Sequence, residues 1–202
     1  MQTQFSRRVG LQFLAVAFGF LIGACAAVGA GGGSSGPAPE PNQTYYSRVG
    51  MRVEPLKKGT GWHMYSTNHI GLEKHLPAGT RFTAQKVGRS KIDLLTEDNT
   101  AVQVEFVARH HPGMSFTAWL EQQFSTSPVE LPGGLDSSER AAIQAGRYEV
   151  GMSRAALFLS VGYPPSKLSP SMNDAMLKYE VKRFNNILFT FDARGKISDI
   201  KN

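Results

Sequence analysis

Apolar and polar residues alternate in short runs through the first half of the chain. From Tyr45 to Val53 the odd positions are mostly apolar and the even positions carry the charges, which predicts a half-buried strand. Further strand-like runs start at Trp62 and Arg81, and the pair 91–95 and 101–108 flanks a polar hairpin loop. Five short strands predict a small β-barrel within residues 44–125.

The spacing of apolar residues becomes helical between Gly113 and Ser125. Phe116, Leu120 and Phe124 recur every four residues, which predicts a helix with an aromatic face at the end of the barrel domain. This face is expected to pack on the barrel or on the next domain, with a groove for a partner as the alternative. Residues 126–135, rich in Pro and Gly, are predicted to be a linker.

Two helices and three strands are predicted in the C-terminal third. Asp136 and Glu139 have the spacing of a capping box, so a helix should start there and stop at Gly146. Ser153 is the predicted N-cap of a second helix, which should end at Gly162 because two prolines follow. Strands of an antiparallel meander are predicted at 177–181, 187–191 and 196–200.

The predicted fold class is therefore α+β. A small β-barrel with a C-terminal helix would occupy residues 44–125, and a two-helix plus three-stranded antiparallel domain would occupy residues 136–202.

Both predicted domains resemble known families. The opening Tyr-Tyr-Ser-Arg-Val at 45–49, the Trp62 strand and the Leu-Pro-Ala-Gly-Thr turn at 76–80 are similar to bacterial SH3-like domains. Gly-Met-Ser at 151–153, Val-Gly-Tyr-Pro at 161–164, and Phe-Thr-Phe-Asp followed by Gly-Lys-Ile-Ser-Asp-Ile resemble the SmpA/OmlA (BamE-like) family. The second resemblance implies a BamE-like fold, an outer-membrane lipoprotein and a role in binding protein partners.

The N-terminal segment predicts export and lipidation. Arg7 and Arg8 precede an apolar stretch, and Ile-Gly-Ala-Cys at 22–25 resembles the lipobox of bacterial lipoproteins. Residues 1–24 are the predicted signal peptide, and Cys25 is the predicted acylated first residue of the mature protein.

Two alternatives for this segment remain open. Cleavage could fall nearer Ala26, or the segment could stay as a membrane helix, because the apolar stretch from Val9 to Ala30 is long enough to span a bilayer. In each case the rest of the chain is exported. Residues 25–43, rich in Gly, Ser and Pro, are predicted to be a lipidated tether.

Composition and charge limit the classes of function. Hydrophobic residues make up 41% and charged residues 19% of the chain, which is typical of globular proteins. The formal net charge is +6, to which Arg7 and Arg8 contribute. The remaining excess is dispersed, so it favours weak attraction to anionic lipid or acidic polymers and argues against a nucleic-acid partner. A single cysteine excludes an intramolecular disulfide.

No motif of the sequence predicts an enzyme. There is no His-Glu-x-x-His, no Gly-x-Ser-x-Gly and no phosphate-binding loop. A metal cluster of His63, His69 and His75 would require the barrel to bring separate loops together, and solvated or capping histidines are favoured instead. The sequence therefore predicts no catalytic residue, no metal and no cofactor.

The resulting functional prediction is a lipid-anchored protein of the cell envelope, placed at the outer membrane and facing the periplasm. It would act as a non-enzymatic binding or scaffold module in outer-membrane protein assembly or envelope integrity. The alternative is an accessory protein whose SH3-like domain binds peptidoglycan or a peptide. Aromatic residues expected to contact partners are Tyr45, Tyr46, Trp62 and Tyr163.

Overall fold

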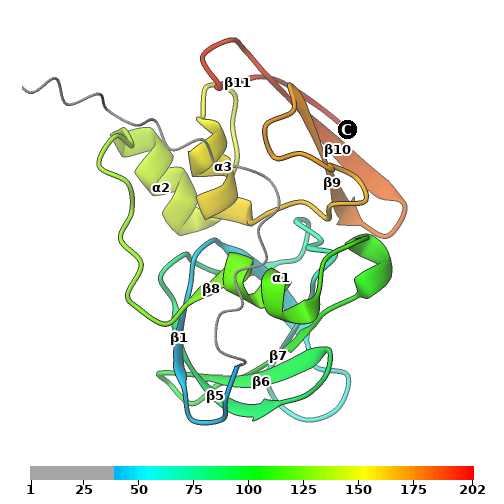
Figure 1. The fold of residues 1–202 in the computed structure, drawn as a ribbon. Helices are drawn as coiled ribbons and strands as arrows, with labels where there is room; N and C mark the ends of the chain where they lie inside the picture. The colour runs from blue at the N-terminus through cyan, green and yellow to red at the C-terminus, as the bar shows by residue number, and fades with distance from the viewer. Residues whose placement is uncertain (1–38) are drawn as a thin grey trace, which may run out of the picture. The chain divides into compact units, whose positions relative to one another are not determined.

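The computed structural model describes residues 39–202, which form two β-sheets and three short α-helices (Figure 1). These residues belong to one compact unit. The predicted signal peptide (1–24), the predicted lipidation site Cys25 and most of the predicted tether lie outside the described residues.

The first sheet is curled and contains eight strands in the order β4-β2-β3-β7-β6-β5-β1-β8. All neighbouring pairs are antiparallel except β3 and β7, which run parallel with Trp62 opposite Val102. The strands are β1 (Thr44–Ser47), β2 (Met51–Pro55), β3 (Trp62–Tyr65), β4 (Lys74–Leu76), β5 (Arg81–Val87), β6 (Lys91–Thr96), β7 (Ala101–Glu105) and β8 (Phe124–Ser125).

Alternation along these strands produces the first hydrophobic core. In β6 and β7 every second residue is buried, so Ile92, Leu94, Val102 and Val104 all point inward. Helix α1 (Phe116–Gln123) adds Trp119 to the same core, where only 1% of this side chain is exposed. A short 3₁₀ helix, η1 (Ala108–His110), precedes it.

The helices of the C-terminal part begin and end where the sequence predicts. Helix α2 (Ser137–Ala145) starts with a capping box between Asp136 and Glu139 and stops at Gly146, whose φ is +63°. Helix α3 (Arg154–Val161) starts at the N-cap Ser153 and stops at Gly162. The second sheet has the order β11-β10-β9 and consists of β9 (Met176–Lys182), β10 (Asn185–Phe191) and β11 (Ile197–Lys201).

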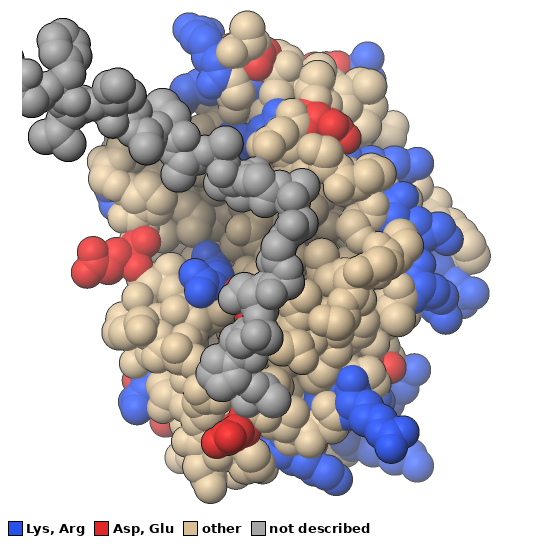
Figure 2. All heavy atoms as spheres, viewed as in Figure 1, with Lys and Arg blue, Asp and Glu red and all other residues tan. Residues whose placement is uncertain are grey.

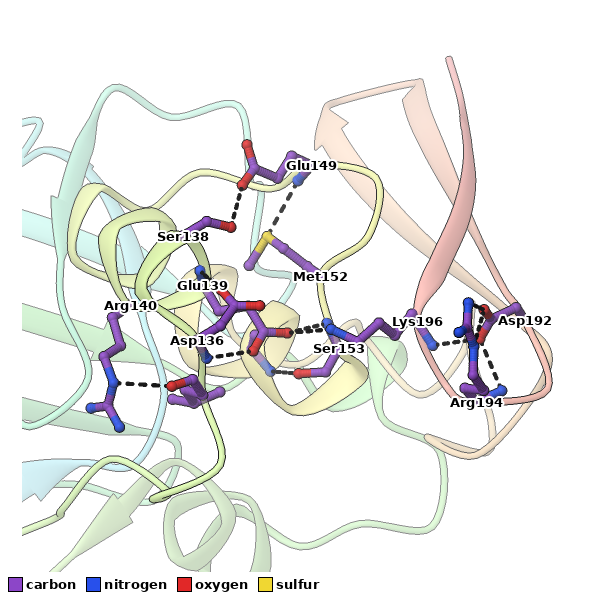
Figure 3. A network of polar contacts seen from close by, with 12 residues as sticks. Asp136, Ser138, Glu139, Arg140, Glu149, Met152, Ser153, Asp192, Arg194 and Lys196 are labelled. Carbon is purple, nitrogen blue, oxygen red and sulfur yellow. Dashed lines mark hydrogen bonds and ion pairs between the residues drawn. The ribbon is translucent and has the colours of Figure 1, made fainter.

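Glu139 joins the two helix starts and the last hairpin (Figure 3). Only 3% of this residue is exposed, yet its carboxylate accepts the main-chain N–H groups of Ser153 at 2.6 Å and Asp136 at 3.3 Å. Lys196 Nζ lies 3.6 Å from the same carboxylate. Burial opposes ionisation, but these donors outweigh it and hold the pKa of Glu139 below its ordinary value.

A second hydrophobic core lies between these two helices and the three-stranded sheet. Its most buried members include Ile143, Leu157, Tyr179 and Phe189. Leu135, from the segment predicted as a linker, is buried in it as well. The hydroxyl of Tyr179 donates to the carbonyl of Gly162 at 2.9 Å, which satisfies the one polar group of this fully buried side chain.

Polar contacts connect the eight-stranded sheet to the helices of the second core. Arg52 on β2 donates to the carbonyl of Gly146 at the end of α2. His75 on β4 donates its Nε2–H to the carbonyl of Ser160, 3.0 Å away. Asn68 donates to the carbonyls of Val161 and Tyr163 at 2.8 and 2.9 Å. Each of these bonds reaches a carbonyl near the end of a helix, where no intrahelical partner is available.

The predicted fold class, a small SH3-like barrel followed by a two-helix BamE-like α+β domain, is wrong. The described residues are mostly β structure, with an eight-stranded mixed sheet, a three-stranded sheet and three short helices. The run from Tyr45 to Val53 forms two strands separated by residues 48–50. A Cβ atom on Gly50 would overlap the Ser160 carbonyl. Strands β4 and β8 also lacked a periodic signal, since strands of two or three residues are too short to show one.

A candidate binding groove at Trp62

A surface groove of about 490 Å³ lies where the end of β2, the start of β3 and the segment leading into β4 meet. Its volume is in the range of small-ligand and side-chain pockets. The groove is lined by Val53, Glu54, Pro55, Trp62, Gly71, Leu72, Glu73 and Lys74.

Trp62 is the one aromatic residue in the lining of the groove. Strand pairing fixes its main chain between Pro55 on β2 and Val102 on β7, and its half-buried ring packs against the first core. Lys74 places its ammonium group 5.6 Å from the centre of the indole ring. This distance gives a cation–π contact, so the chain's own lysine covers part of the aromatic surface.

The segment at Gly71 forms a fixed wall. The main-chain N–H groups of Ile70 and Gly71 donate to the carbonyls of Glu180 and Val181 on β9, at 3.0 and 2.8 Å. A Cβ atom on Gly71 would lie 2.5 Å from the Val181 carbonyl oxygen, so only glycine fits this approach. Main-chain hydrogen bonds to β9 therefore fix the position of this wall.

Carboxylates outnumber cations in the lining of the groove, which includes Glu54 and Glu73 but only one lysine, Lys74. His63 stands behind Glu54, with its Nδ1 4.0 Å from one Glu54 oxygen and its Nε2 3.5 Å from Glu105. Burial lowers the pKa of His63, although both carboxylates oppose that shift. The acidic character of the groove rests on its lining, which has two carboxylates and one ammonium group.

The structure does not bring the four predicted contact residues together. Only Trp62 lines the groove. Tyr45 is 8% exposed, donates its hydroxyl to Gln43 at 2.6 Å and packs in the first core. Tyr46 is half-buried on β1. Tyr163 is also half-buried, with its ring centre 4.9 Å from that of Phe158, and burial raises its pKa.

The histidines considered for a metal site have separate partners. His63 lies between carboxylates, His69 pairs with Glu180 at 2.8 Å, and His75 contacts a helix carbonyl. Burial, reinforced by nearby Arg52, lowers the pKa of His75 to about 4. Within residues 39–202 no three His, Cys, Asp or Glu side chains are grouped so that they could hold a metal ion.

Sequence reasoning identified Trp62 but missed the charged residues around it. Glu73 and Lys74 lie in a stretch with no periodic pattern, and they reach Trp62 only because β4 pairs with β2. The pairing of Val53 with Lys74 places the lysine beside the groove. No local signal in the sequence could have indicated this pairing, because it joins residues far apart in the chain.

Comparison with known proteins adds no relative to this description: no family model, curated protein or solved structure matches the chain. Among residues 39–202, none of the helices has the length and apolar character needed to cross a membrane.

Proposed function

We propose that the protein is a lipid-anchored, non-enzymatic binding protein of the bacterial cell envelope, and that its Trp62 groove holds an extended segment of a partner polypeptide. The observation that carries the proposal is the half-buried Trp62 ring in a groove of about 490 Å³ with an acidic rim. Envelope assembly factors are the expected partners.

The chemistry of the groove selects the kind of segment that fits. The indole ring favours an apolar or proline-containing stretch, as aromatic-lined peptide grooves do. Glu54 and Glu73 favour a Lys or Arg in that stretch. Lys74 occupies the position over the ring that such a cation would take, so binding would displace it.

The proposed envelope location rests on the N-terminal pattern, with Cys25 as the anchored residue. Acyl chains on this cysteine would hold the chain at the membrane, and the Gly/Ser/Pro-rich tether would separate the folded part from the lipid. Intact-mass measurement of the membrane-extracted protein tests this point. A mass equal to residues 25–202 plus acyl chains supports it, and an unmodified full-length mass contradicts it.

A peptide array tests the groove. The full chain would be probed with synthetic peptides that combine proline or an aromatic residue with arginine. Binding to every variant would be followed by the fluorescence anisotropy of a dye on the peptide, and tryptophan emission would be a second readout for the chains that keep Trp62. Trp119 is 1% exposed, so a change in emission on binding reports Trp62. We expect Trp62→Ala to abolish binding, Glu73→Gln to weaken the arginine-containing peptides selectively, and Tyr46→Phe to have no effect.

The same variants separate the proposal from its rival. If isolated peptidoglycan retains the wild-type chain and Trp62→Ala does not, while no peptide binds, the groove recognises the cell wall instead. Binding of peptides with equal affinity by wild type and Trp62→Ala would exclude the groove as the site. Stoichiometric hydrolysis or turnover of a bound peptide would contradict the non-enzymatic part of the proposal.

A further inference from the structure

The turn between β9 and β10 exposes an aromatic side chain. Phe184 is 88% exposed, the highest value among the large hydrophobic residues of the described chain that stand out from the surface. It occupies the tip of the hairpin with a φ of +64°. An aromatic residue in this position covers no part of either core.

The backbone at Phe184 is unfavourable for this residue type. Positive φ values are the region of Gly, Asn and Asp, because a Cβ atom crowds the main chain there. The other hairpin of the same sheet uses Gly195 for the same purpose, with a φ of +73°. Strain at a side chain without burial points to a contact made outside the folded chain.

Two basic residues adjoin the tip. Lys182 and Arg183 precede Phe184, both are exposed, and the Arg183 guanidinium lies 4.9 Å from the centre of the phenyl ring. Lys178 is exposed on the same outer face of β9, since alternate residues of a strand share a face. Glu180 lies between them on that face, but its carboxylate is bound to His69 at 2.8 Å.

The surface beside the hairpin extends this positive charge. Burial lowers the pKa of His110, Glu180 opposes this shift, and Arg109, Lys167 and His69 add to it, so these charged groups lie near His110. Arg109 and Lys167 are both exposed, and the main chain of Lys167 is bonded to that of His110 at 3.0 Å. Figure 2 shows Lys and Arg side chains gathered on the side of the molecule where Figure 1 places the β9–β10 hairpin.

We propose that the β9–β10 hairpin is a membrane contact, in which Phe184 inserts into an anionic bilayer while Lys182 and Arg183 bind the phosphates of the lipid headgroups. A protruding aromatic residue beside two exposed cations is complementary to a soft, flat and negatively charged surface. The inference rests on the proposed membrane location, because the tether would bring this hairpin within reach of the bilayer. It concerns a different surface from the Trp62 groove.

A tryptophan placed at the tip tests the contact. The full chain with Phe184→Trp would be mixed with phosphatidylcholine vesicles that contain about a third phosphatidylserine, some of them made with brominated acyl chains. We expect the additional emission to shift to the blue and to be quenched by the brominated lipid. The shift should be smaller with pure phosphatidylcholine and should decrease with added salt.

Val150→Trp is the matched control, because Val150 is also exposed, at 60%, but lies away from the tip. The N–H of its neighbour Gly151 donates to the carbonyl of Ile197, at the end of the three-stranded sheet opposite the β9–β10 turn. Its emission should not be quenched. Adding Lys182→Gln and Arg183→Gln to the tip variant should weaken insertion roughly thirtyfold, at about fivefold for each basic side chain.

Three results would overturn the proposal: no quenching at position 184, equal quenching at positions 150 and 184, or insertion that is unchanged by the loss of both cations. Binding of the tip to a protein instead of lipid would appear as the first result. If the membrane-extracted protein carries no acyl groups but its tip still inserts into vesicles, only the proposed lipid anchor is contradicted. Failure of the anchor can therefore be told apart from failure of the membrane contact.

Discussion

Replacing Glu139 tests whether one buried carboxylate holds α2, α3 and the β10–β11 hairpin together. In the wild-type protein it accepts two main-chain N–H groups and faces Lys196 (Figure 3). Alanine at this position would leave the N–H groups of Asp136 and Ser153 without an acceptor, and each orphaned buried donor costs about 1–3 kcal/mol. Partial access of water lowers the sum, so we expect a loss of about 3 kcal/mol.

Glutamine keeps the shape of the side chain and separates charge from packing. Its carbonyl oxygen can still accept the Ser153 N–H, but its amide N–H₂ then faces the N–H of Asp136, where a donor meets a donor. The attraction to Lys196 is also lost. We expect Glu139→Gln to cost about 2 kcal/mol, a large share of the roughly 5–15 kcal/mol that stabilises a typical domain.

Urea unfolding followed by circular dichroism measures these losses. If the free energy of unfolding falls by about 2 kcal/mol per molar urea, a loss of about 3 kcal/mol of stability would lower the unfolding midpoint by about 1.5 M. Glu149→Gln is the matched control, because this exposed carboxylate accepts a bond from Ser138 in the same network. It should change stability by less than about 0.5 kcal/mol. Equal midpoints for Glu139→Gln and Glu149→Gln would refute the reasoning.

Three further predictions concern other parts of the chain. The pKa of His75 is about 4 in the folded protein, below its unfolded value, so this group's contribution to stability is complete above pH about 6.5 and is lost as the pH falls toward 4. In unfolding measured across that range, His75→Gln should reduce the loss of stability by up to about 2 kcal/mol. Tyr179→Phe leaves the Gly162 carbonyl without its donor and should cost about 1–2 kcal/mol in urea, whereas a loss below 0.5 would contradict the role of this bond. Phe184→Gly should increase the free energy of unfolding by roughly 0.5 kcal/mol and so raise the melting temperature slightly, because glycine tolerates the positive φ without strain. A clear decrease in melting temperature would show that the ring stabilises the fold.

Part of the site was accessible from the sequence, and part was not. Trp62 was identifiable because an aromatic residue at the start of a strand-like run is a candidate for partner contact. Tyr45 has the same local signal, yet it is buried, with its ring against Phe124 at 6.2 Å. Whether an aromatic residue faces a partner or a core depends on what packs over it, which a single strand pattern does not contain. The exposed Phe184 was missed for the same reason.

Local sequence signals were sufficient to predict the elements of the C-terminal part. The capping box at Asp136, the N-cap at Ser153 and the stops at Gly146 and Gly162 lie where expected, because helix ends depend on the side chains and φ angles of a few neighbouring residues. The alternation of Leu177, Tyr179 and Val181 likewise gave β9. These are short-range effects, and the chain encodes them residue by residue.

The pairing of the strands and the surfaces that remain open depend on the packing of the folded chain. Contacts between residues far apart in sequence produce the parallel pairing of β3 with β7, the interruption before β2 at Gly50, and the edge strands β4 and β8. The result is an eight-stranded sheet in place of the predicted small barrel. The same pairings assembled the Trp62 groove from segments with no common motif. The periodicity of hydrophobic residues shows which face of a strand is buried, whereas the packing of the whole chain determines which strand it pairs with.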